Sequence, residues 1–193
     1  MAGQTTDKRY GKVAMILHWV IALLIIGQLA GGKFFTSLSF ATDSELRISL
    51  TQTHKAIGLT VLALSVFRLL WRLTHKAPAL PGGMSAFERL AAKFTHIVFY
   101  GLIIALPLSG WLMVSPYNND ISYFGLFNWP KIPGVEGNNQ LGEVMNTSHE
   151  YLGYFAMAMI ALHIAAALKH HFINKDDVLS RMAPIIKSKS KEI

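Results

Sequence analysis

The stretch HEYLGYFAMAMIALHIAAAL, residues 149–168, decides the fold of this chain. It carries no charged side chain from Tyr151 to Leu168, which is close to the length of about 20 mostly apolar residues that a helix needs to cross a bilayer. The same stretch carries His149 at its start and His163 near its end. Ionisable side chains inside a membrane span are costly and mark functional sites. The stretch therefore predicts a membrane helix with a functional site built on histidine.

Three further segments have the length and polarity of membrane helices. Val13–Gly31 and Phe94–Val114 contain no charged residue, and both are at least as long as the uncharged run of the first stretch. The segment Ile48–Trp71 contains Lys55 and Arg68 near its ends, where long side chains can reach the membrane interface. We therefore predict an all-α, integral membrane four-helix bundle that forms a single domain over residues 1–193, with helices at about 13–31, 48–71, 94–114 and 149–170.

The composition agrees with a membrane protein. Hydrophobic residues make up 52% of the chain and charged residues 15%, whereas soluble domains carry about 25% charged residues. The net charge of +7 does not indicate nucleic-acid binding, because the cations avoid the apolar spans and cluster at their ends. The chain has no cysteine, which excludes disulfides, thiolate metal sites and covalently attached haem.

Lysine and arginine are distributed unequally between the two sides of the predicted bundle. Fourteen of the 18 lie in the N-terminal tail, the second connection and the C-terminal tail. The positive-inside rule then predicts a multi-pass protein of a bacterial inner membrane, with both termini in the cytoplasm. Residues 185–193 are predicted to form a disordered cationic tail suited to anionic lipid.

Four histidines fall into two pairs by depth in the membrane. His18 and His163 each lie five residues inside the cytoplasmic end of their spans, about 7–8 Å deep. His54 and His149 lie at the outer edge. His149 and His163 are separated by almost four whole turns of helix, so they project from nearly the same face, about 21 Å apart along the axis. The pattern predicts two stacked haems, with His54 and His149 as iron ligands of the outer haem and His18 and His163 as iron ligands of the inner one.

Two glycines stand near the outer pair. Gly58 and Gly153 follow His54 and His149 by four residues each, which places them on the same helix face as the histidines. A missing side chain there would leave room for a porphyrin. Close helix packing explains such glycines equally well.

A fifth histidine, His96, lies two residues inside the third span. Its depth makes it a poorer iron ligand, and a hydrogen bond to a haem propionate or to a quinone carbonyl is an alternative role. With Arg72 and Trp71 it forms a candidate quinone site at the inner interface, although ordinary membrane anchoring also explains the last two. The other histidines are expected to be polar residues of the interface: His75, His170 and His171.

A histidine site for zinc or copper is the main competing interpretation of the four histidines. Against a metal carrier, none of the four apolar cores contains Asp or Glu, which transport paths for cations usually add. Iron with two axial histidines has no free position for oxygen, so such a site suits electron transfer.

The chain resembles the bacterial cytochrome b561 family over nearly its whole length. The matching features are the His18-Trp19 pair, His54 with Gly58, the third-helix residues 96–100 and 105–110, the fourth-helix residues 149–154 and 162–171, and the ending 175–184. The resemblance implies four helices in the inner membrane, two haems b, and the ligand pairs His18 with His163 and His54 with His149. It also implies electron exchange with ubiquinone, and in at least one type of member the oxidation of superoxide.

These observations predict a di-haem b cytochrome that transfers electrons between a donor at the periplasmic face and the quinone pool. Superoxide:ubiquinone oxidoreduction is the most specific form of this hypothesis. An anionic donor would benefit from a positive funnel, but the outer side carries Lys33, Arg47, Lys55 and Lys131 against six acidic residues. A cytochrome b subunit of a membrane dehydrogenase, with a periplasmic partner as donor, is the alternative within electron transfer.

Overall fold

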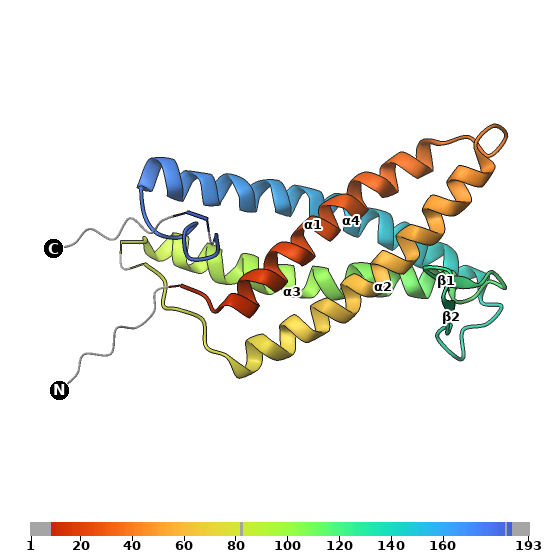
Figure 1. Ribbon diagram of the computed structural model, residues 1–193, viewed down its shortest axis with the longest axis horizontal. Coiled ribbons are helices and arrows are strands. Elements are labelled where there is room, and N and C mark those ends of the chain that lie inside the picture. Colours follow the sequence, from red (N-terminus) through yellow and green to blue (C-terminus); the bar gives the residue numbers. More distant parts are fainter. Residues whose placement is uncertain (1–8, 82, 184, 187–193) are drawn as a thin grey trace.

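The computed structural model describes residues 9–81, 83–183 and 185–186, and it has four long helices (Figure 1). The helices are α1 (Lys12–Ser37), α2 (Ser44–Thr74), α3 (Ala86–Val114) and α4 (Asn139–Lys169), and a π-helical turn (His170–Asn174) follows α4. All four are long and apolar enough to cross a membrane. The predicted all-α membrane bundle is therefore confirmed. Most of the predicted cationic tail, residues 187–193, lies outside the described residues.

Helices α3 and α4 begin before their uncharged segments, at residues whose side chains cap the first turn. At the start of α3, the Ser85 hydroxyl accepts a hydrogen bond from the Glu88 amide at 3.2 Å, and the Glu88 carboxylate accepts one from the Ser85 amide at 2.9 Å. At the start of α4, the Asn138 side chain accepts from the Leu141 amide at 3.0 Å. Each such cap contributes about 1 kcal/mol.

Helices α1 and α2, α2 and α3, and α3 and α4 pack extensively against each other, whereas the described parts of α1 and α4 do not. In Figure 1, α1 crosses α4 near the middle of the bundle. The two described ends of the chain lie together, because the Tyr10 amide donates a hydrogen bond to the Arg181 carbonyl at 3.2 Å. We call this end of the bundle the tail end.

A small β-hairpin marks the opposite end, which we call the hairpin end. Strands β1 (Ile121–Tyr123) and β2 (Phe127–Trp129) are antiparallel, with Ile121 opposite Trp129. The side chain of Ile121 is only 1% exposed, and the Tyr123 hydroxyl lies 3.0 Å from the Thr60 hydroxyl of α2. The hairpin therefore folds back onto the half of α2 that carries His54. It is the one β-element that the described residues add to an otherwise helical fold.

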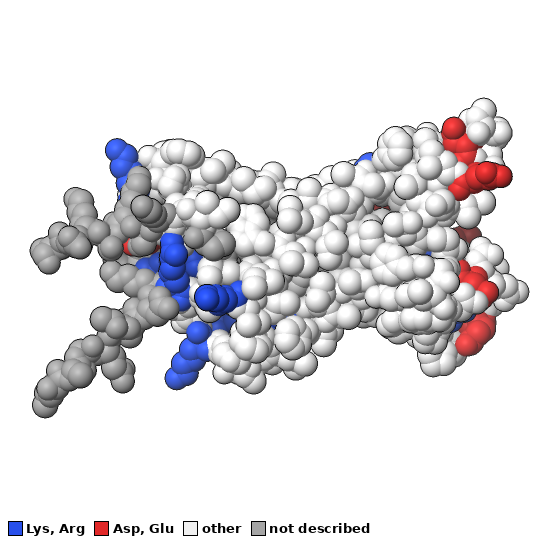
Figure 2. Space-filling view, in the orientation of Figure 1, with Lys and Arg blue, Asp and Glu red and all other residues white. Residues whose placement is uncertain are grey.

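The two ends of the bundle differ in charge. Lys and Arg side chains gather at the tail end and Asp and Glu side chains at the hairpin end, with an uncharged surface between them (Figure 2). Large apolar side chains on this middle surface are exposed, among them Leu23, Phe67 and Ile97. A bilayer would cover that apolar belt and leave both charged ends in water.

Candidate functional site: two histidine pairs in one cavity

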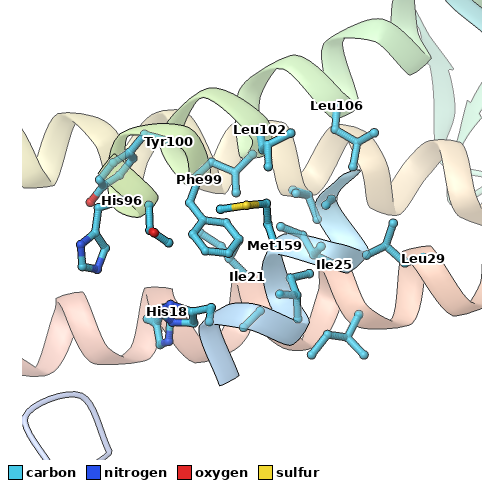
Figure 3. A pocket seen from close by; sticks show the side chains of 18 of the residues that line it. His18, Ile21, Ile25, Leu29, His96, Phe99, Tyr100, Leu102, Leu106 and Met159 are labelled. Atoms are coloured by element: carbon cyan, nitrogen blue, oxygen red, sulfur yellow. The ribbon is translucent and has the colours of Figure 1, made fainter. Parts of the chain in front are cut away.

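A cavity of about 2150 Å³ runs along the inside of the bundle from Tyr10 at the tail end to Ile121 at the hairpin end. Pockets for one small ligand usually have about 300–1,000 Å³, so the space exceeds that of a single such site. Figure 3 shows part of it, with His18 from α1 and His96 from α3 entering a space lined mainly by apolar side chains such as Phe99 and Met159.

The histidines form two pairs across the cavity. The ring centroids of His18 and His163 lie 6.4 Å apart, and those of His54 and His149 lie 6.1 Å apart. A metal ion bonded at about 2.0 Å to one nitrogen of each of two opposed imidazoles places the ring centroids about 6.3 Å apart. Both pairs therefore have the spacing of two axial ligands on one metal ion. The tertiary structure thus brings together the same histidine pairs that were predicted from their depth in the membrane.

The ring of His149 is held in one orientation by α3. Its Nδ1 atom lies 3.0 Å from the Leu106 carbonyl oxygen and 3.0 Å from the Ser109 hydroxyl. A carbonyl only accepts hydrogen bonds, so Nδ1 carries the proton and donates it to Leu106. The Nε2 atom then keeps its lone pair for a metal. Metal-binding histidines commonly donate their other ring nitrogen to a carbonyl in this way.

His54 on α2 is less completely satisfied. Its Nδ1 atom is buried and has no hydrogen-bond partner among the residues that the structure describes. The Gln28 side chain fixes the backbone by donating to the His54 carbonyl at 2.8 Å, and the Phe35 ring packs at 5.2 Å between centroids. A buried, unpaired ring nitrogen costs about 1–3 kcal/mol. Such an atom fits a site that a bound group completes.

At the tail end a third histidine joins the pair. The ring centroid of His96 lies 6.3 Å from that of His163, as close as that of His18. The Phe99 ring also packs against His163, with centroids 5.2 Å apart. His96 was expected to be a poorer iron ligand because it lies nearer the surface than His163. One turn of α3 carries both His96 and Phe99 to His163, because α3 packs directly against α4.

No group of three or more His, Asp or Glu side chains within the described ranges is arranged to share one metal ion. A bare zinc or copper ion at either pair would have two protein ligands, fewer than such ions require. Haem iron takes four ligands from its porphyrin and needs two more along the axis. The paired histidines therefore fit haem better than a bare ion.

Comparison with known proteins agrees with this chemistry. Residues 9–184 match the family described as prokaryotic cytochrome b561. This chain belongs to that family. It is accordingly a membrane electron-transfer protein of the inner membrane, and membership implies that it binds haem b.

Several relatives of the cytochrome match along almost their whole length. Cytochrome b561 homolog 2 of Escherichia coli K12 is 32% identical, with 94% of this chain and 95% of the relative aligned. Cytochrome b561 homolog 1 of the same organism is 31% identical, with 91% and 97% aligned. A probable superoxide oxidase, CybB, of Yersinia pestis is 29% identical, with 92% and 97% aligned.

Two further glycines of the cytochrome, Gly32 and Gly110, lie directly against the outer histidines. A Cβ atom on Gly110 would lie 3.0 Å from Cε1 of His149, and one on Gly32 would lie 3.4 Å from Cε1 of His54. Each glycine lies 14 residues after a histidine of its own helix, Gly32 after His18 and Gly110 after His96. This is the spacing that relates His149 and His163, so helical periodicity could have identified both glycines. The contact exists because α3 packs on α4 and α1 packs on α2.

The glycines that the sequence did select have different surroundings. A Cβ atom on Gly58 would meet no described atom within 4 Å, and this residue lines the cavity. A Cβ atom on Gly153 would meet Cδ2 of Leu29 at 3.7 Å, where α1 crosses α4. Room for a porphyrin therefore stays a prediction at both positions. At Gly153, close helix packing is visible as well.

Gly110→Ala should weaken cofactor binding at the hairpin end. The new methyl group would have to displace the His149 ring, which is held between α3 and α4. The matched control is Gly101→Ala on the same helix, where a Cβ meets no described atom within 4 Å and helix propensity rises by about 1 kcal/mol. Haem content and reduced absorption spectra of the two purified variants test this. A normal spectrum for Gly110→Ala would show that the His149 ring needs no such space.

Trp71 and Arg72, the other two candidates for a quinone site, line the tail end of the cavity. The Trp71 ring stacks on His75 with centroids 3.8 Å apart and planes 7° apart. The Arg72 guanidinium donates to the His75 carbonyl at 3.1 Å. Both side chains thus help to terminate α2. Their part in binding a quinone stays a prediction.

Proposed function

We propose that this cytochrome holds two haems b, one between His54 and His149 and one between His18 and His163, and that it transfers electrons between a donor at the hairpin end and the quinone pool. The observation that carries the proposal is the pair of ring-centroid distances, 6.1 and 6.4 Å, at two positions on the same face of α4. Both distances fit six-coordinate iron.

Bound haem b supplies one-electron transfer, and the protein's residues prepare the two sites for it. The four histidines fill both axial positions, which leaves no place for oxygen on the iron. The Leu106 carbonyl keeps the proton of His149 on Nδ1. Apolar side chains such as Ile21, Phe99 and Met159 exclude water from the space beside the rings (Figure 3).

The proposed acceptor, ubiquinone, would bind at the tail end beside the inner pair. Three features support this position. The cavity reaches the tail end and is lined there by Trp71 and Arg72. His96 faces the same space as His18, and it offers a ring nitrogen to a quinone carbonyl if His18 is the iron ligand (Figure 3). The exposed apolar belt beside this end gives a quinone a route from the bilayer.

Superoxide is the most specific proposal for the donor. It is suggested by the name of the Yersinia pestis relative and by Lys55, which lines the cavity next to His54. Within the described part of the chain, the Lys55 side chain makes no hydrogen bond or ion pair, whereas Lys33 is bound to Glu150 with Nζ 3.1 Å from Oε1. The acidic hairpin end in Figure 2 argues the other way, because an acidic surface repels an anion.

The proposal is tested on protein purified in detergent from cells with ample haem. We expect about two haems b per chain by the pyridine haemochrome assay and sharp low-spin bands on reduction. Reduced protein should be reoxidised by a ubiquinone analogue. Superoxide from an enzymatic source should reduce the wild type and should reduce Lys55→Gln several-fold more slowly. A chain without haem would sink the proposal, and reduction only by a co-purified subunit would favour the dehydrogenase alternative.

The proposed orientation, with the tail end in the cytoplasm, has its own test. Alkaline phosphatase fused to the C-terminus should be inactive, because this enzyme needs the disulfides of an oxidising compartment. The same enzyme inserted between Phe40 and Ala41, in the connection from α1 to α2, should be active. Green fluorescent protein at the C-terminus should fluoresce. The reverse pattern of phosphatase activity would invert the proposed direction of the bundle.

A further inference from the structure

The chain reverses direction after α4 and returns across the tail end of the bundle (Figure 1). Lys175 ends the π-helical turn with a positive φ of 55°, and the Asp176 amide donates to the His170 carbonyl at 3.2 Å. We call residues 176–183 the cap. They belong to the ending that contributes to the family resemblance, and neither haem ligation nor quinone binding gives them a role.

Hydrogen bonds tie the cap to distant parts of the chain. The Trp19 indole donates to the Met182 carbonyl at 2.9 Å, and the Tyr10 amide donates to the Arg181 carbonyl at 3.2 Å. The Arg181 guanidinium donates to the carbonyl of Ala79, in the connection between α2 and α3. The cap thus joins the start of α1 to the connection that leads into α3, beneath the cavity.

The cap also lines the tail end of the cavity, which contains the His18–His163 pair. Val178, Leu179 and Met182 line the tail end of the cavity, and Ser180 is only 4% exposed. Trp19, which the cap holds, follows His18 in the chain, and the two rings lie 5.3 Å apart between centroids. The cap therefore covers the inner pair and contacts the neighbour of one of its ligands.

Besides the backbone hydrogen bond between them, a side-chain hydrogen bond fastens Asp176 of the cap to His170, directly after α4. His170 is 7% exposed, and its Nδ1 atom lies 2.6 Å from Oδ2 of Asp176. The other carboxylate oxygen, Oδ1, accepts from the Val178 amide at 3.0 Å. His170 lies at a helix end, as expected for a polar residue of the interface, but the returning cap buries it.

We propose that residues 176–183 form a cap that shields the His18–His163 site from water, with His170 and Asp176 as the positioning residues that hold it closed. The part that concerns haem rests on the proposed function. Water near a haem stabilises the more highly charged oxidised iron, so solvent exposure lowers the reduction potential. A closed cap would therefore keep the potential of the inner haem higher than an open one.

Because the chain has no cysteine, an introduced cysteine provides a single thiol whose accessibility can be measured by labelling. Ser180→Cys places one thiol inside the cap, and Lys76→Cys places one at an exposed position of the same end. In purified full-length protein, a water-soluble maleimide should modify the S180C protein at least about tenfold more slowly than the K76C protein. Adding Asp176→Asn to S180C should remove most of this protection, and Asp176→Glu should restore part of it. His171→Gln, beside the positioning histidine, is the matched control and should change nothing.

Either of two labelling results would contradict the proposal that residues 176–183 form a protective cap. The thiol of S180C could react as fast as that of K76C, or Asp176→Asn could leave its rate unchanged. A redox titration of Asp176→Asn supplies the second readout, in which the potential of one haem should fall while that of the other stays constant. Unchanged potentials beside an accessible thiol would overturn the shielding role. Labelling needs no haem, so protein that lacked haem but protected the S180C thiol would contradict the proposed function and leave the cap intact.

Discussion

Replacing His163 by alanine should remove one of two haems from the cytochrome and leave the other in place. His163 contributes one ring to the tail-end pair, whose centroids are 6.4 Å apart, and a haem with a single axial histidine is held far less firmly. The hairpin-end pair takes its α4 ring from His149, almost four turns earlier on the helix, and does not use His163. The haem content should therefore fall from about two to about one per chain.

The measurement is a pyridine haemochrome assay on purified protein, together with low-temperature reduced spectra that resolve the two haems. His149→Ala should remove the other haem, so that the two variants lose different spectral components. His171→Ala is a suitable control, since this residue lies near the same helix end without facing the cavity. Loss of the same component from both alanine variants would contradict the assignment of one haem to each end.

Replacing His18 by alanine should remove the same haem as His163→Ala, whereas His96→Ala should retain both haems. The ring distances do not distinguish these residues, because the His18 and His96 centroids lie 6.4 and 6.3 Å from that of His163. The helices do. α3 packs directly on α4, and this leaves little width for a porphyrin between His96 and His163, while α1 is not packed extensively on α4 within the described residues. We therefore expect the inner haem between His18 and His163 rather than between His96 and His163.

The same two variants separate the roles proposed at the tail end. His96→Ala should keep the spectrum of the wild type and slow reoxidation by a ubiquinone analogue, since it removes a hydrogen-bonding group beside the proposed quinone position. His18→Ala should lose haem before any rate can be compared. If His96→Ala loses the haem and His18→Ala keeps it, the iron ligands are His96 and His163, and His96 has no role in binding quinone.

Hydropathy and helical spacing were sufficient for the outline of this protein. The uncharged runs predicted the four membrane helices, because burial in lipid requires apolar side chains along a whole span. The spacing between His149 and His163 predicted that two sites share α4, because positions separated by nearly whole turns of a regular helix face the same way. Hydropathy and helical spacing are properties of a single helix, so they can be predicted from the local sequence.

The tertiary structure alone decided which groups surround the histidines. Gly110 against His149, the Leu106 carbonyl at its Nδ1 atom, and His96 beside His163 are contacts between α3 and α4. The partners in these contacts are distant in the chain, and no periodicity links them. The burial of His170 by residues 176–183 has a similar cause, since it depends on how the chain turns after α4 and on what it meets there. The sequence by itself therefore determined the membrane spans and the pairing of the histidines by depth, and the packing of the helices determined how those histidines are oriented, crowded and covered.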